Sequence, residues 1–189
     1  DVSAKRPAQL ASRYIPYVEL EDELDSWASL AIRGTLAAPR VWIRGGNLRY
    51  RPPTGAPLEH LQGELFYQGN EKHGVVAFND ISGTVMGAGF HMEGLWDLMS
   101  GAMTARIQGR GLPLYTFMPA QYADITPRTI NGTVLLRWVF PLHSHVEFIF
   151  DAHGDGGLFQ QADCRGVVVF ADGQFLFSEQ FSWDSPILR

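Results

Sequence analysis

The hydrophobic residues of this chain alternate with polar or small residues over most of its length. A period of two is typical of β-strands that have one apolar face. Three rows stand out: Thr84, Met86, Ala88, Phe90, Met92, Gly94 and Trp96; then Val134, Leu136, Trp138 and Phe140; then Val146, Phe148, Phe150 and Ala152. The same pattern predicts further strands near 30–36, 41–50, 61–68, 74–81, 102–109, 166–171 and 174–183. The chain is therefore predicted to be all-β.

Turn residues separate these predicted strands. They are Gly45-Gly46-Asn47, Pro52-Pro53-Thr54-Gly55, Gly69-Asn70, Gly154-Asp155-Gly156-Gly157 and Asp172-Gly173, and 141–145 is predicted to connect two strands. Helix is predicted only as short turns at 8–15 and 112–118, each ended by a proline. Antiparallel hairpins are the simplest way to join strands through such short connections.

An internal repeat is suggested by an offset of about 103 residues between Pro16 and Pro119. The same offset lays 61–67 on 164–170, and with one residue of slip it lays 30–33 on 134–137. We therefore expect two β-repeat units, 1–110 and 111–189, with the second cut short, in one continuous sheet.

A sheet with such rows has an apolar face that must be covered. It can fold on itself and fill its interior with side chains, or it can form an open trough whose apolar lining meets lipid. The alternation is the same in both cases. The residues predicted to line a lipid-facing groove are Met86, Ala88, Phe90, Met92, Val134, Leu136, Trp138, Val146, Phe148 and Phe150.

Composition narrows the classes of function. Hydrophobic residues make up 46% of the 189 residues and charged residues 19%, which excludes a disordered chain. The net charge of -5 argues against a nucleic-acid-binding protein. A single cysteine, Cys164, excludes an internal disulfide framework and is predicted to be a small core residue. No apolar run reaches the roughly 18 residues of a membrane span, and we expect an excised piece whose anchor lies outside it.

Three clusters have residue types that can carry chemistry. Alternation would put Asp151, His153 and Asp155 on one side of a strand, where they could bind a cation, and His143 and His145 could chelate zinc with a third ligand. The acidic run 19–25 could supply paired carboxylates. Each is better explained as a polar strand end, a solvated connection or a solvated face. We therefore predict no enzyme, no metal and no cofactor.

A series of motifs recurs in a fixed order from Ser29 onward. Ser29–Val41 is an apolar strand followed by Gly-Thr-Leu, x-x-Pro and a second strand. The series continues through the spaced residues of 58–67, Asp80-Ile81-Ser82-Gly83-Thr84-Val85-Met86-Gly87, Glu93-Gly94, Gly109-Arg110-Gly111-Leu112-Pro113-Leu114 and Phe117-Met118-Pro119. This order of motifs resembles the AsmA-like superfamily and looks closest to its TamB branch.

The resemblance implies an elongated, curved, antiparallel-rich sheet with an apolar interior, often called a β-taco. It implies a periplasmic segment of an inner-membrane-anchored bacterial envelope protein that bridges the two membranes. The expected partners are phospholipid acyl chains and, through the full-length protein, an Omp85-class outer-membrane barrel. The expected roles are phospholipid transport and outer-membrane protein assembly.

Two other functions stay open. A closed β-sandwich or barrel could bind carbohydrate or protein, with the directions of Trp42, Trp96 and Trp138 as the discriminating feature. A jelly-roll hydrolase could use Asp151 and His153. The sequence offers no nucleophile with an adjacent base for the second of these.

Overall fold

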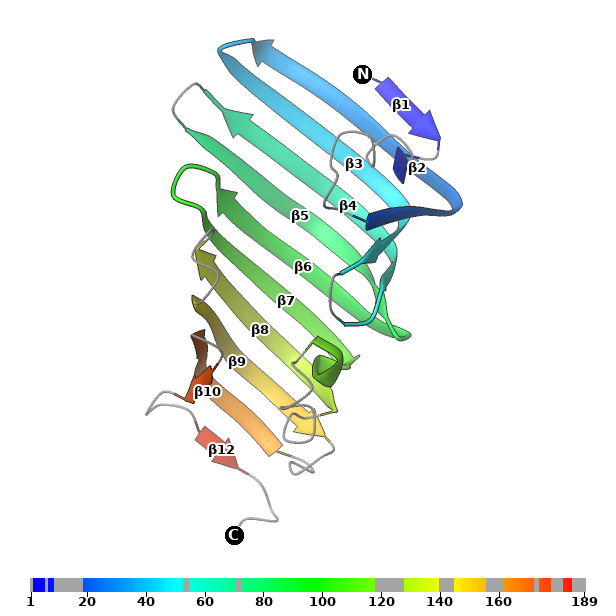
Figure 1. Ribbon diagram of the computed structural model, residues 1–189. Coiled ribbons are helices and arrows are strands. Elements are labelled where there is room, and N and C mark those ends of the chain that lie inside the picture. The colour runs from blue at the N-terminus through cyan, green and yellow to red at the C-terminus, as the bar shows by residue number, and fades with distance from the viewer. Residues whose placement is uncertain are drawn as a thin grey trace.

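The alternating segments pair side by side into one antiparallel sheet (Figure 1). The structure is a computed structural model that describes residues 2–5, 7–8, 19–52, 55–70, 73–117, 128–139, 145–155, 162–171, 174–177 and 182–184. The strands are β1 (Val2–Lys5), β2 (Glu19–Thr35), β3 (Ala38–Arg51), β4 (Leu58–Gly69), β5 (Gly74–Val85), β6 (Ala88–Asp97), β7 (Ala102–Leu112), β8 (Thr129–Val139), β9 (His145–Asp155), β10 (Ala162–Ala171), β11 (Gln174–Phe177) and β12 (Ser182–Asp184). A 3-10 turn, η1 (Leu114–Phe117), follows β7.

The sheet is an open meander. Its 12 strands follow chain order from β1 to β11, while β12 pairs with β10. Among the described strands, β1 does not pair with β11 or β12, so the sheet does not close. The predicted all-β fold with a curved antiparallel sheet is confirmed. The short turn predicted at 112–118 is confirmed by η1, and most of the one predicted at 8–15 lies outside the described residues.

The row predicted from Thr84 to Trp96 as one strand is wrong. β5 ends at Val85, Met86 and Gly87 form a two-residue turn, and β6 begins at Ala88. Both turn residues have positive φ, +49° for Met86 and +81° for Gly87, as a twisted two-residue hairpin requires. A two-residue turn exchanges the two faces, so Val85 shares a face with Ala88 and Thr84 lies on the other.

Several strand limits also differ from the prediction. β2 begins at Glu19, so the acidic run belongs to this strand. The segment predicted as one strand at 174–183 contains β11 and β12, which pair with different parts of β10, and residues 178–181 lie outside the description. Strand β7 runs through residues 110 and 111, and the two-unit repeat stays a prediction.

A line of β-bulges crosses the first four long strands. Asp25, Asn47, His60 and Asp80 all have left-handed backbones, with φ between +51° and +58°. The strand register shifts at or beside each of them. Asp, Asn and His are the side-chain-bearing residues that tolerate this conformation best. Because each bulge bends its strand and increases its twist, bulges in adjacent strands bend the sheet along a line.

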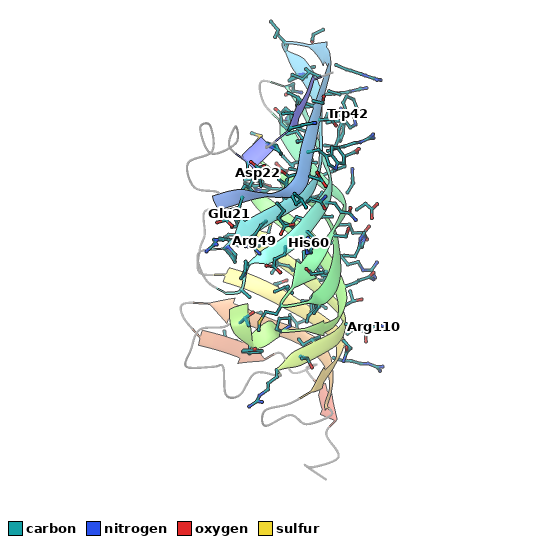
Figure 2. All side chains as sticks on the ribbon, turned by 90° about the vertical axis from the view of Figure 1, so that its right-hand side faces the viewer. Glu21, Asp22, Trp42, Arg49, His60 and Arg110 are labelled. Carbon is teal, nitrogen blue, oxygen red and sulfur yellow. The ribbon has the colours of Figure 1, made fainter. Side chains whose placement is uncertain are left out.

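The sheet has two chemically different faces. In the nearly edge-on view, Trp42 and Arg110 project to its convex side (Figure 2). The register puts their rows on the outer face and the alternate rows on the inner, concave face. The described inner-face side chains of β2 to β8 include Leu30, Ile32, Val41, Ile43, Leu61, Leu65, Tyr67, Val76, Phe78, Ile81, Val85, Ala88, Phe90, Met92, Trp96, Met103, Ala105, Ile107, Val134, Leu136 and Trp138.

The inner face is only partly covered. The chain exposes 12325 Å² of surface, whereas a compact protein of 21.1 kDa exposes about 9,000 Å². The buried hydrophobic residues among those described are Ala8, Val85, Ala105, Ile130 and Val134. None of the larger described side chains is fully buried. No second layer lies against the apolar side of the sheet within the described residues, so much of that side stays accessible.

Candidate functional site

The inner face is most accessible over β2 and β3. Leu30, Ile32 and Ile43 are exposed by 36%, 63% and 43%. Cross-strand pairing connects them to the neighbouring strands, since Ile43 lies opposite Leu30 on β2 and Leu65 on β4. Aliphatic residues in this arrangement offer a surface that can exclude water from a hydrocarbon chain.

The same face is covered near the end of β7. Here the chain turns back as Pro113, which is buried, and η1, which lies beside β8. The hydroxyl of Tyr115 donates to the sulfur of Met86 at 3.9 Å, and the hydroxyl of Thr116 donates to the Pro113 carbonyl at 2.8 Å. Beneath this segment Val85 and Ile130 are each 3% exposed. This part of the inner face is therefore a small filled core.

Glycines do not open extra space on the inner face. Gly87 lies in the turn and Gly89 lies on the outer face, so neither leaves room beside Ala88 on the inner face. A Cβ at Gly83, on the inner face, would lie 2.9 Å from the Leu61 side chain and 3.3 Å from the Phe90 ring. Neighbouring side chains thus fill the places where glycine leaves a gap.

The predicted groove residues fall mostly on one face. The register aligns Phe90 with Gly83, Met92 with Ile81 and Ile107, and Val134 with Ile107. Val146, Phe148 and Phe150 occupy the positions opposite Trp138, Leu136 and Val134. Met86 is the exception, because it lies in the turn and is 62% exposed.

The inner-face residues on β2 to β5 were missing from the predicted groove. Ile32, Ile43, Leu65 and Phe78 continue the same surface across four strands. Their alternation was visible in the sequence. The phase of each row relative to the others was not, because the bulges at Asn47 and elsewhere shift it.

Ion pairs across adjacent strands hold the outer face. Arg44 pairs with Glu64, Arg106 approaches Glu93 at 4.0 Å, Arg137 approaches Glu147 at 3.7 Å and Arg165 approaches Asp151 at 3.5 Å. Each pair joins residues that face each other across two neighbouring strands. Opposite charges at such positions help set the strand register.

The acidic run at the start of β2 is partly paired. Arg49 binds Glu59 and lies 3.7 Å from Glu23 and 3.8 Å from Glu21. Arg51 approaches Glu21 at 2.8 Å, and the His60 ring approaches Glu23 at 2.8 Å. These carboxylates therefore tie β2, β3 and β4 together beyond the bulges. The carboxylates form a structural network with the arginine and histidine side chains that lie between them.

Asp22 anchors the N-terminal segment. Its Oδ1 accepts hydrogen bonds from the Ala8 backbone at 2.9 Å and from the Ser26 hydroxyl at 3.1 Å. Ala8 and Ser26 are buried. Figure 2 shows Asp22, Glu21 and Arg49 on the side away from Trp42. A short segment before β2 is thereby held against the bent end of the sheet.

The tryptophans do not share one direction. Trp96 and Trp138 lie on the inner face opposite Met103. Trp42 lies on the outer face, 4.9 Å from the Phe66 ring centroid, and the Arg33 guanidinium stacks over it at 5.6 Å. Two of these three tryptophans therefore lie on the inner face and one lies on the outer face. Their directions do not separate a lipid groove from an aromatic binding module.

The structure brings no metal-binding set together within the described part of the chain. The Asp151 carboxylate, 82% exposed, faces Arg165. His153 lies at the register position between Asn131 and Asp163, and His143 lies outside the described residues. An exposed ion pair explains Asp151 without a cation.

Among the described titrating groups, Asp97 has a clearly perturbed pKa. The backbone N–H groups of Met99 and Ser100 donate to Asp97 at 2.9 and 3.2 Å, and together they hold the pKa of this carboxyl below its usual value. Such bonds stabilise the ionised form. Asp97 is half-buried at the end of β6, and both donors belong to the β6–β7 turn, so the perturbation reports a turn cap.

No helix in the described ranges is long and apolar enough to cross a membrane. The chain matches no family model, no curated protein and no solved structure. The function therefore has to be argued from the faces of the sheet.

Proposed function

We propose that this chain is a segment of a periplasmic, inner-membrane-anchored envelope protein whose inner face carries phospholipid acyl chains between the inner and outer membranes. The observation that supports this best is the apolar inner face itself. It continues from β2 to β8 with a hydrophobic residue at most described positions, and Ile32 and Ile43 are open to solvent. An apolar surface of this length on one side of a single-layer sheet indicates an apolar partner.

The energetics fit an acyl chain. Burying a methylene group is worth about 0.8 kcal/mol, so exposing a chain of roughly sixteen carbons to water costs on the order of 12 kcal/mol. A continuous apolar face offsets most of that cost at every step along the sheet. Similar side chains along the face keep the affinity even, so a lipid can move without being trapped. This role needs no catalytic group.

The resemblance to the AsmA-like superfamily, TamB branch, supports a periplasmic location for this surface. The Gly34-Thr35-Leu36 phrase between two apolar strands, on which that resemblance rests, forms the end of β2 and the turn to β3. In the full-length protein we propose contact with an Omp85-class outer-membrane barrel and a role in outer-membrane protein assembly. Open sheet edges at both ends of the meander would suit pairing with neighbouring strands.

The experiment is native mass spectrometry of the purified chain with lipid extraction of the same sample. A charge against hydrocarbon costs roughly 2.5–3.5 kcal/mol, so Ile43→Asp and Phe90→Asp should each lower bound phospholipid more than tenfold. Gln108→Asp, on the outer face, is the matched control and should retain the wild-type lipid. Far-UV circular dichroism establishes that all three variants keep the sheet.

A lipid-free wild type would reject the proposal, as would equal loss in all three variants. Ile43 is the more decisive position because its side chain is already 43% exposed, so a charge there spares the fold. Loss of lipid at Phe90 alone would indicate a local pocket in place of a continuous face.

The outer face supports a second candidate, a saccharide- or protein-binding surface built on Trp42 and Phe66. The closed sandwich first considered for this role is wrong, because the sheet is open. Stacking of a sugar ring on Trp42 would quench tryptophan fluorescence, and Trp42→Ala would abolish the effect. Quenching that survives this substitution would count against the outer-face candidate.

A further inference from the structure

A shallow hollow of about 690 Å³ lies at the end of the sheet where β2 turns into β3 and β4 into β5. Its floor is apolar: Phe66, Ala77 and Leu95 occupy one cross-strand row of the outer face. Its rim is polar, with Arg40, Gln68 and His73 among the lining residues. The volume lies within the range of small-molecule sites.

Arginine is paired differently at this hollow from the rest of the outer face. Arg44, four residues along β3, binds Glu64 on the next strand. Arg40 instead faces Arg33 directly across the β2–β3 pair, and neither has a carboxylate partner among the residues the structure describes. Like charges at directly opposed positions are unfavourable. An anion placed between them would relieve that repulsion.

The other groups at the rim complement the arginines. Arg33 is held over Trp42 by stacking, which leaves Arg40 to line the hollow. A guanidinium offers two parallel N–H donors to a phosphate or carboxylate, and the Gln68 amide adds neutral donors. Asp97, the nearest acid along this row, is engaged by the turn at Met99 and Ser100.

We propose that this hollow binds a compact amphiphilic anion, with its phosphate or carboxylate on Arg40 and its apolar body on Phe66 and Leu95. The site lies on the outer face and is separate from the acyl-chain surface. A small aromatic phosphate satisfies both halves, because its ring can lie on the Phe66 floor while its charge meets Arg40. No bond is formed or broken.

The test is isothermal titration of the chain with naphthyl phosphate, and with naphthol as the uncharged counterpart. The phosphate is expected to bind at least tenfold more tightly than naphthol, and binding should weaken as salt increases. Arg40→Gln is expected to weaken the phosphate at least tenfold, and Leu95→Asn to weaken both compounds. Arg137→Gln, on the same face but paired with Glu147, is the matched control and should change affinity less than twofold.

Equal affinity for the two compounds, or unchanged binding by Arg40→Gln, would overturn the proposal. Vesicles of anionic phospholipid provide the competing source of charge. Vesicle binding that depends on Arg40, without binding of naphthyl phosphate, would indicate that Arg40 contacts a membrane surface. It would also overturn the proposal that the hollow binds a compact anion. Ile43→Asp should leave phosphate binding unchanged, so a failure here is distinguishable from a failure of the acyl-chain proposal.

Discussion

Two regions of the inner face, one over β2 and β3 and the other over β7 and β8, are both apolar but differ in how exposed their side chains are. Leu30, Ile32 and Ile43 are exposed by at least 36%, whereas Ala105 and Val134 are exposed by 3% and 8%. Both regions are apolar rows of an antiparallel sheet. At one end of the second region Pro113 and η1 fold back beside β8, and no such segment lies over the first region among the described residues.

The same kind of apolar surface is thus found in two environments, one covered and one open. Where the chain covers its own sheet, apolar residues stabilise the fold. Where it leaves the sheet open, the same residue types are available to a ligand. Stability and binding should therefore respond to substitutions in different regions.

The largest difference in stability between the two regions is expected when an aspartate is introduced into each. Val134→Asp places an uncompensated carboxylate at a position that is only 8% exposed and should lower the free energy of unfolding by about 3–5 kcal/mol. Ile32→Asp, at a side chain 63% exposed, should change it by no more than about 0.5 kcal/mol. Urea unfolding followed by circular dichroism measures both. Comparable losses would show that the two regions are equally buried.

The next largest effect on stability is expected at the bulges that bend strands β2 to β5. Asn47 has a left-handed backbone with φ of +55°. Asn47→Val should cost about 1–2 kcal/mol of unfolding free energy, because a β-branched residue is strained there. Asn47→Gly is the control and should be tolerated, since glycine adopts positive φ freely. Equal stability of the two variants would mean that the bulge relaxes at no cost.

A smaller effect is expected on the outer face behind each region. Arg40→Glu converts the opposed arginines behind the open region into an opposite-charge pair with Arg33, and should raise the free energy of unfolding by about 0.5 kcal/mol. Arg137→Glu, which would face Glu147 behind the covered region, should lower it by a similar amount. Unfolding at low salt gives the largest difference, and the same sign for both would contradict the assigned pairing.

The smallest effect lies at the β6–β7 turn between the two regions. The Met99 and then the Ser100 backbone N–H groups lower the pKa of Asp97, so the ionised form is favoured in the folded state. The turn's stabilisation is complete above the unfolded pKa and is lost as pH falls through the lower, folded pKa. The Met99 amide shift should report a midpoint below the usual 3.8, and Asp97→Asn should remove it. A midpoint above 3.8 would mean that the cap is absent in solution.

Much of the fold could be predicted because alternation and turn residues are local signals. The strands near 41–50, 61–68 and 102–109 lie within β3, β4 and β7. The Met86 error arose because no glycine or asparagine occupies the first turn position, and the alternation runs visually through the turn. A methionine at positive φ is uncommon, so the propensity of Met86 argued for the strand.

The candidate site was only partly predictable for a different reason. Val134, Leu136 and Trp138 share a strand, so their common face follows from a period of two. Joining them to Phe90 or Ile43 requires the register between strands. That register depends on bulges at Asp25, Asn47, His60 and Asp80. The turn predicted at Gly45-Gly46-Asn47 is wrong, because these residues form a bulge inside β3.

The sequence by itself determined that the chain forms antiparallel strands with one apolar face, because side chains alternate locally along any strand. Only the tertiary structure decided which part of that face is covered, because cover depends on how the neighbouring strands and η1 pack against it. It also decided that Arg40 faces Arg33 while Arg44 faces Glu64, because cross-strand register brings together residues that are distant in the chain.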